Sequence, residues 1–399
     1  MVKWLIAIAV LLMSGTTALP DQNSSDAARA LARPYARFGF EVLRDLAAQH
    51  PDGNTFISPT SIAVALAMTA NGADGATQKA ILATLHSGAE SIAGFNAANR
   101  ALAEQINKTT AVQLSMANAL WLQQGISIEP SFRQALQSDY SAEAENLDFR
   151  NPESTHTINA WVAKHTNDLI RKLLDHIDPA TVTMLTNAIA FKGKWTLQFD
   201  PKETQPHDFK AASGAALKVP LMKHSGQYSY ANANGLEAIR LPYADGTFAM
   251  YVVLPGDPNR MRSFLDELTP DVFTSLTSSL QSRRGTIELP RFTMEYSATL
   301  NSILMKLGMG VAFGSDANFR GINKSRPLQI SEVRHASFLR VDEEGTEAAA
   351  ATSVGIRAAV ARVEPPPFHM VVDRPFFIAI RDERDNQVLF TGVIADPKS

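Results

Sequence analysis

The amino-acid sequence predicts an α+β fold with antiparallel sheets, organised as one domain. Helical spacing of apolar residues dominates the first half of the 399-residue chain, whereas alternation of apolar and polar residues dominates the second half. Strands and helices do not alternate regularly, which argues against a parallel α/β sheet. No linker rich in proline or glycine divides the chain, and 399 residues suffice to bury one sizeable core.

The first half is expected to consist mainly of helices. Apolar residues recur at helical spacing in these segments, and breakers such as Asn71-Gly72 mark their ends. After Pro152 the same spacing continues as far as Leu174 and predicts one long amphipathic helix. Helices are expected at residues 27–49, 59–70, 74–85, 91–107 and 152–174, and a strand at residues 112–122.

The second half is expected to consist mainly of strands. Its short apolar segments alternate with polar residues, and many of them are bounded by proline or glycine. Short helices interrupt them at residues 261–268 and 299–307. Strands are expected at residues 181–191, 217–222, 236–242, 248–254, 285–295, 328–341, 375–380 and 388–394.

The composition excludes several classes of function. The chain has 37 Lys and Arg against 40 Asp and Glu, and this net charge of -3 argues against a general nucleic-acid-binding protein. It has no cysteine, which removes disulfides, thiolate nucleophiles, lipidated anchors and cysteine-ligated zinc. Its nine histidines lack the spacing of metal ligands, and the common catalytic signatures are missing. We therefore expect no metal and no cofactor.

The N-terminus has the pattern of a secretory signal peptide. Lys3 precedes an apolar run at residues 4–13, which is too short to span a bilayer, and small residues follow up to Ala18. We expect residues 1–18 to be removed and residues 19–399 to be secreted or periplasmic, without a stable membrane anchor. The alternatives are a buried N-terminal helix and an uncleaved anchor.

The most unusual segment begins at Asp342 and supports two conformations. It could start a helix, because Thr346 would cap it and the alanines that follow favour helix. It could also form a strand with one uncharged face, which a sheet could bury. The uncharged face would hold Thr346, Ala348, Ala350, Thr352, Val354 and Ile356, and the other face would hold Glu347, Ala349, Ala351, Ser353, Gly355 and Arg357. Pro365-Pro366-Pro367 closes the stretch as a stiff extended segment.

Six motifs, in this order along the chain, resemble those of the serpins, the serine protease inhibitors. They lie at residues 54–62, 186–195, 289–292, 343–352, 373–378 and 390–393. The resemblance covers nearly all of the mature chain. It implies the serpin fold, with three antiparallel β-sheets, eight to nine helices and an exposed reactive-centre loop at about residues 343–367. It also implies that the helix at residues 152–174 lies across the central sheet.

The resemblance implies a monomeric suicide inhibitor that forms a covalent acyl-enzyme complex with a serine protease. The cleaved loop would insert into the central sheet and distort the protease. Because the inhibitor is consumed in this step, the resemblance implies that the chain is not an enzyme. Its hinge would comprise Glu343, Glu344, Gly345, Thr346, Glu347, Ala348, Ala349, Ala350, Ala351 and Thr352. Heparin-binding serpins carry a basic face on the helix that corresponds to residues 91–107. This segment offers only Arg100, so no heparin site is expected.

The family's usual spacing, counted forward from Glu343, places the cleaved bond between Ala359 and Val360. Alanine suits the small primary pocket of elastase-like proteases, and a subtilisin-like target is also considered. Arg357 and Arg362 lie close by, and either one would suit a trypsin-like or a cysteine protease if the register of the loop differs.

Two further groups of residues match the family. Ser58, Ser61, Asn187 and His335 match a polar cluster beneath the central sheet, and Trp195, Arg291 and Glu343 match the point where that sheet opens. The alternative is that they are ordinary core or capping residues.

Two other classes of function stay open. A non-inhibitory serpin would serve as a binding, carrier or chaperone protein, although such relatives often have bulky or charged hinge residues. A secreted hydrolase with a dispersed triad has no sequence signature, because triads are recognised by geometry.

Overall fold

The computed structural model describes residues 22–257, 260–345 and 365–398. Within these residues the chain forms nine α-helices, in agreement with the eight to nine expected. The helices are α1 (Gln22–Gln49), α2 (Pro59–Ala70), α3 (Gly75–Thr84), α4 (Ile92–Asn107), α5 (Pro130–Tyr140), α6 (Glu153–His165), α7 (Arg260–Glu267), α8 (Pro270–Ser278) and α9 (Asn301–Leu304). No helix among them is long and apolar enough to cross a membrane.

The strands of the described residues form two hydrogen-bonded sheets. The strands are β1 (Thr55–Ile57), β2 (Val112–Gln123), β3 (Glu143–Leu147), β4 (Thr183–Gly193), β5 (Gln205–Lys210), β6 (Ala216–Ala233), β7 (Leu236–Tyr243), β8 (Phe248–Pro255), β9 (Gln281–Pro290), β10 (Phe292–Thr299), β11 (Glu332–Val341), β12 (Phe368–Val371), β13 (Phe376–Asp382) and β14 (Gln387–Ile394). The five-stranded sheet has the order β10-β11-β4-β2-β3. The nine-stranded sheet has the order β1-β14-β13-β8-β7-β6-β9-β12, with β5 paired to β6.

This sheet arrangement is consistent with the expected fold and differs in detail from three antiparallel sheets. The pairs β2–β3, β4–β11 and β9–β12 are parallel. β6 is 18 residues long and pairs with β5, β7 and β9 along its length. It therefore joins these strands into one nine-stranded sheet. A sequence pattern shows which residues alternate, but it does not show the direction of the neighbouring strand.

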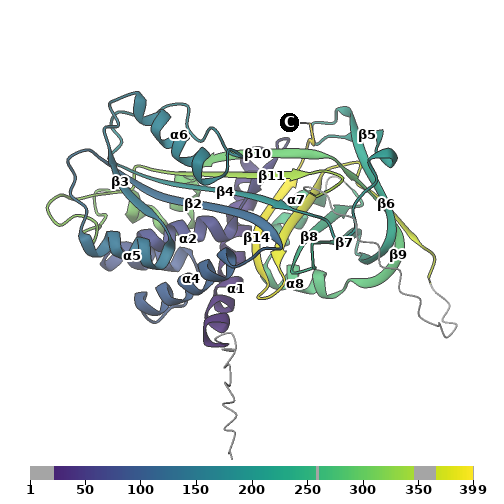
Figure 1. Cartoon of the computed structure of the whole chain (residues 1–399), viewed down its shortest axis with the longest axis horizontal. Helices are drawn as coiled ribbons and strands as arrows, with labels where there is room; N and C mark the ends of the chain where they lie inside the picture. The colour runs from purple at the N-terminus through teal and green to yellow at the C-terminus, as the bar shows by residue number, and fades with distance from the viewer. Residues whose placement is uncertain (1–21, 258–259, 346–364, 399) are drawn as a thin grey trace, which may run out of the picture.

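The helices cover both faces of the five-stranded sheet (Figure 1). On one face, Ile158 and Val162 of α6 belong to the same buried cluster as Ala336 and Phe338 of β11. On the other face lies α2, in which every residue is buried. A helix that is apolar on all sides belongs in a core. Ser58, which precedes α2, and Ser61 in its first turn are buried with it.

The helix expected at residues 152–174 is shorter, because α6 ends at His165. Asn167 and Asp168 adopt the left-handed conformation, with φ of 52° and 61°, which breaks the helix. The side chain of Asn159 then holds the returning chain, since its Oδ1 accepts hydrogen bonds from the amides of Leu173 (2.8 Å) and Leu174 (2.9 Å). These leucines still pack on the sheet, which explains why the apolar spacing continued past the helix.

The strand expected at residues 285–295 is two strands that belong to different sheets. β9 ends at Pro290, which has no N–H to donate, and β10 begins at Phe292. Between them, the amide of Arg291 donates to Pro220 O at 2.9 Å. The sequence patterns missed six further strands and α-helices, which are β1, β3, α5, β5, α8 and β12.

Candidate functional site

The seam between β4 and β11 is the feature on which the candidate site is built. These two strands are parallel neighbours, with Glu332 opposite Met184 at one end and Leu339 opposite Phe191 at the other. We call the end near Val341 and Gly193 the hinge end, because β11 continues from there into Asp342–Gly345. The opposite end, near Glu332, is called the far end.

At the hinge end, residues 342–345 are hydrogen-bonded to the segment that follows β4. The amide of Trp195 donates to Glu344 O at 3.3 Å, and the amide of Phe199 donates to Glu343 O at 2.9 Å. The indole Nε1 of Trp195 donates to Asp342 O at 2.9 Å. The chain is therefore held against the end of β4 up to Gly345, the last described residue before the gap.

Gly345 is required here by its conformation and by its surroundings. Its φ is +80°, and a Cβ atom added to it would lie 2.6 Å from Gly193 O and would also collide with Trp195 N. A residue with a side chain could not take this position unless the backbone after β4 moved.

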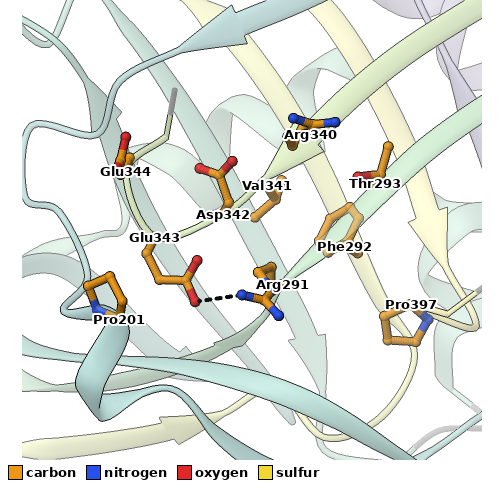
Figure 2. Close-up of a pocket in the computed structure, with 10 residues that line it drawn as sticks. All are labelled: Pro201, Arg291, Phe292, Thr293, Arg340, Val341, Asp342, Glu343, Glu344 and Pro397. Atoms are coloured by element: carbon orange, nitrogen blue, oxygen red, sulfur yellow. Dashed lines mark hydrogen bonds and ion pairs between the residues drawn. The ribbon is translucent and has the colours of Figure 1, made fainter. Parts of the chain in front are cut away.

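The carboxylate of Glu343 is the buried charge of the hinge end. Its Oε1 accepts a hydrogen bond from Thr204 Oγ1 at 2.8 Å and lies 3.4 Å from Arg291 Nη1. The side chains of Glu343 and Arg291 point toward each other and line a pocket of about 550 Å³ (Figure 2). Glu343 is 8% exposed whereas Arg291 is 53% exposed, so water screens the ion pair mainly from the arginine side.

Trp195 and Tyr243 form an aromatic pair at the hinge end. Trp195 stacks on Tyr243 with ring centroids 4.3 Å apart and an interplanar angle of 14°. Burial raises the pKa of the Tyr243 phenol, and the nearby Asp342 carboxylate raises that pKa further. The phenol is therefore neutral at physiological pH.

A polar cluster crosses the middle of the seam, where His335 of β11 lies opposite Asn187 of β4. His335 Nδ1 lies 2.6 Å from Asn187 Oδ1, and the amide of Ser58 lies 3.3 Å from His335 Nε2. Asn187 Nδ2 donates to Ser61 Oγ at 2.5 Å and to Asn118 Oδ1 at 2.5 Å. The cluster thus connects both strands of the seam to β2 and to the start of α2.

The contacts determine the protonation of His335. An amide can only donate, so Nε2 accepts from Ser58, and Nδ1 carries the proton that it donates to Asn187. Burial lowers the pKa of His335 to about 3, because a charged imidazole would lose its hydration here. The serine at Ser58 also caps α2, since its Oγ accepts from the amide of Ser61 at 3.1 Å.

The structure brings together both groups of residues that the sequence pointed to. Ser58, Ser61, Asn187 and His335 form one hydrogen-bonded cluster, and Trp195, Arg291 and Glu343 lie at the hinge end of the seam. Other residues named from the sequence lie outside the described residues: the signal segment 1–18, Thr346, Glu347, Ala348, Ala349, Ala350, Ala351, Thr352, Arg357, Ala359, Val360 and Arg362.

Sequence patterns missed three residues of this site, which are Asn118, Thr204 and Tyr243. Asn118 left a trace, because it is an amide within the apolar run of β2. No sequence pattern indicated Thr204 or Tyr243, because only tertiary contacts with Glu343 and Trp195 bring them to the site. In the described part of the chain, no group of His, Asp or Glu is arranged to hold a metal ion.

Comparisons with known proteins agree with this geometry. A family model described as Serpin (serine protease inhibitor) matches residues 33–397. Serpin-Z7 of Hordeum vulgare is 32% identical over 382 residues, which cover 90% of this chain and 95% of that protein. The structure of mouse protein-Z-dependent protease inhibitor is similar with a TM-score of 0.84 and 28% identity, over 94% of this chain and 100% of that one. Human thyroxine-binding globulin is similar with a TM-score of 0.84 and 25% identity, again over 94% and 100% of the two chains. These neighbours confirm the serpin fold, and the chain belongs to the serpin family.

Proposed function

We propose that this serpin is a suicide-substrate inhibitor of serine proteases. In this proposal a protease attacks the loop after Gly345 and becomes trapped as an acyl-enzyme when the cleaved loop enters the seam between β4 and β11. One observation carries the proposal: β4 and β11 are parallel neighbours, and β11 leads directly into the loop.

The direction of the strands explains why the seam can accept one more strand. A strand that follows β11 after a tight turn must run antiparallel to β11. Because β4 is parallel to β11, the same strand is also antiparallel to β4. Insertion therefore replaces one parallel ladder by two antiparallel ladders, which are slightly more stable per residue.

The polarity of the loop supports the same geometry. The side chains of β11 that face the core include His335, Ser337, Leu339 and Val341, all of them buried. A strand beside them must present an uncharged face inward. The loop has such a face, which begins at Thr346 and consists of small and apolar residues.

The covalent step balances without a cofactor. The serine oxygen of the protease attacks the carbonyl carbon of Ala359, and the peptide bond between Ala359 and Val360 breaks. The amine of Val360 leaves with a proton, and an ester remains between the protease and the loop. Trapping at this stage consumes the inhibitor, so there is no turnover.

Incubation with elastase, subtilisin, chymotrypsin and trypsin tests this function. We expect a complex with elastase or subtilisin that survives SDS, and an intact mass that shows cleavage after Ala359. Cleavage after Arg357 or Arg362 would favour a trypsin-like or a cysteine protease as the target. Cleavage by every protease without any covalent complex would contradict the inhibitory function.

A carrier function is the second candidate, because one structural neighbour is a thyroxine-binding globulin. A carrier does not need loop insertion. It would be cut without trapping the protease and without becoming more stable.

We also propose that the chain is secreted or periplasmic after removal of residues 1–18. Its support is the sequence pattern alone, since this segment lies outside the described residues. N-terminal mass analysis of the exported protein tests it, and a mature chain that begins at Leu19 is expected.

A further inference from the structure

We propose that a pocket at the far end of the seam binds the side chain of Arg357 once the cleaved loop has inserted. The inference rests on the proposed function, because it concerns the inserted state. It assigns Arg357 the role of an anchor that holds the inserted strand at its full depth.

The pocket lies at the point where an inserted strand would leave the sheet. It has a volume of about 490 Å³, and both flanks of the seam contribute to it. The segment before β4 contributes His176, Asp178 and Thr181, and the β11 side contributes Ile330, Glu332 and Arg334.

The alternation of β11 determines which residues face this pocket. Val333, His335 and Leu339 face the core, so Glu332 and Arg334 point to the other face, which α6 covers farther along the strand. Directly opposite residues of neighbouring strands point to the same face. The uncharged face of the loop must meet the core face of β11, so even-numbered loop residues pair with odd-numbered β11 residues.

The turn after β11 determines the register. The amide of Gly345 donates to Asp342 O at 3.3 Å, so residues 342–345 already form a turn. A hairpin around this turn places Thr346 opposite Val341. Continuing the pairing beyond Glu332, where β11 begins, places Arg357 beside Ile330, which also lines the pocket. A turn longer by two residues would bring Arg357 opposite Glu332, and its side chain would still enter the pocket.

The charges around the pocket suit a guanidinium group. The carboxylate of Asp178 accepts a hydrogen bond from the amide of Ala180 at 2.9 Å, and no cation pairs with it among the described residues. Glu332 adds a second carboxylate to the lining, and its Oε1 lies 2.6 Å from Arg334 Nε. The exposed His176 is the remaining titratable group of the lining. Asp175 is near in sequence, but it is paired with Lys172 at 2.5 Å.

Hydrogen bonds across the far end of the seam oppose complete insertion of the loop. Ser331 closes the seam there, because its Oγ accepts hydrogen bonds from the amides of Val182 (3.1 Å) and Thr183 (3.3 Å). Its own amide donates to Thr183 O at 2.9 Å. Complete insertion must break these bonds, and contacts of Arg357 with the pocket would offset part of that loss.

The test compares the thermal stability of the cleaved protein between variants. The full chain is cut with elastase or subtilisin, and intact mass must place the cut after one of residues 358–361, so that Arg357 stays on the inserting fragment and Arg362 does not. The variants are Arg357→Gln, Arg357→Lys, Asp178→Asn, Glu332→Gln and the combination of Arg357→Gln with Asp178→Asn. The matched control is Arg362→Gln, which removes the same charge from the same loop on the other side of Ala359–Val360.

We expect Arg357→Gln to lower the Tm of the cleaved form by about 1–3 °C in a fixed concentration of guanidinium chloride, with little change in the uncut form. Arg357→Lys should retain most of the stability, and Arg362→Gln should change nothing. The effects of Arg357→Gln and Asp178→Asn should be less than additive, because both remove the same contact. If a pocket variant fails to fold, the test rests on the Tm of the cleaved form in the loop variants alone. Arg357→Gln is then compared with Arg357→Lys and with Arg362→Gln.

The outcomes distinguish this inference from the proposed function. If the cut wild-type protein gains no stability and forms no covalent complex, the proposed function fails and the anchor fails with it. If the wild-type protein gains stability and Arg357→Gln gains it equally, the inhibitory function stands and the anchor is wrong. If the effects of Arg357→Gln and Asp178→Asn on the Tm add fully in the combined variant, Arg357 binds elsewhere and this pocket is not its site.

Discussion

At the scale of single residues, His335 makes the seam sensitive to acid. Its pKa is about 3 when buried, whereas an exposed imidazole has a pKa near 6.5. Between pH 3 and pH 6.5, the imidazole of His335 is therefore protonated in the unfolded chain and neutral in the folded chain. Stability from this group is complete above pH 6.5 and is lost as the pH falls toward 3, by roughly 1 kcal/mol per pH unit.

We expect the free energy of unfolding to decrease between pH 7 and pH 5, and His335→Gln to remove much of that dependence. Denaturant unfolding at both pH values measures it. The control is His207→Gln, which changes an exposed histidine and should leave the pH dependence unchanged. An unaltered slope in His335→Gln would show that other groups cause the loss.

The contacts of Glu343 predict an order of importance for its two partners. Thr204 donates to a carboxylate that is 8% exposed, whereas Arg291 is 53% exposed. We expect Thr204→Val to destabilise the uncut protein by about 1–3 kcal/mol, because a buried charge loses its hydrogen bond. Arg291→Gln should cost less than about 1 kcal/mol. Denaturant unfolding of both variants checks the order, and a larger effect of Arg291→Gln would reverse this interpretation.

At the scale of elements, the core face of the inserting strand predicts how a charge at the hinge acts. Once the loop inserts, Thr346 would lie opposite Val341, so its side chain would enter the core. We expect Thr346→Arg to slow insertion and raise the stoichiometry of inhibition several-fold, since a buried unpaired charge costs several kcal/mol. The matched control is Glu347→Arg, whose side chain would face outward. Equal effects of the two variants would contradict the assignment of the faces.

The pairing of β12 with β9 provides a further prediction at this scale. Phe368 of β12 stacks on Tyr230 with centroids 4.0 Å apart, and a Cβ atom at Gly285 of β9 would collide with the Phe368 ring. We expect Gly285→Val to weaken the attachment of β12 and to increase hydrogen exchange of residues 368–371. Gly310→Ala is the control for loss of a glycine, because nothing lies within 4 Å of its Cβ position and its φ of -51° suits a residue with a side chain. Unchanged exchange in Gly285→Val would mean that Phe368 repacks without cost.

At the scale of the whole molecule, the proposed function requires a closed five-stranded sheet that is less stable than its six-stranded product. We expect cleavage of the loop to raise the Tm by about 10 °C or more, which corresponds to several kcal/mol for a chain of this size. Differential scanning calorimetry before and after cleavage measures it. If the Tm is unchanged, the seam does not accept the loop.

Local signals in the sequence predicted most helices and strands, and the order of the motifs predicted the family. α2 begins at Pro59 and ends at Ala70, as expected, because Ser58, Pro59 and Asn71-Gly72 are signals that act within one turn. The end of α6 was predicted wrongly, since Asn159 holds the returning chain through contacts that periodicity does not contain.

What the sequence by itself determined is local: the alternation of the segment after Gly345, the caps and breakers, and the residue types of the polar cluster. Only the tertiary structure decided that β4 and β11 are parallel neighbours, that Thr204 and Asn118 join the site, and that a pocket lies at the far end of the seam. The physical reason is that alternation constrains which face a side chain takes. The direction and identity of the neighbouring strand depend on contacts between residues far apart in the chain.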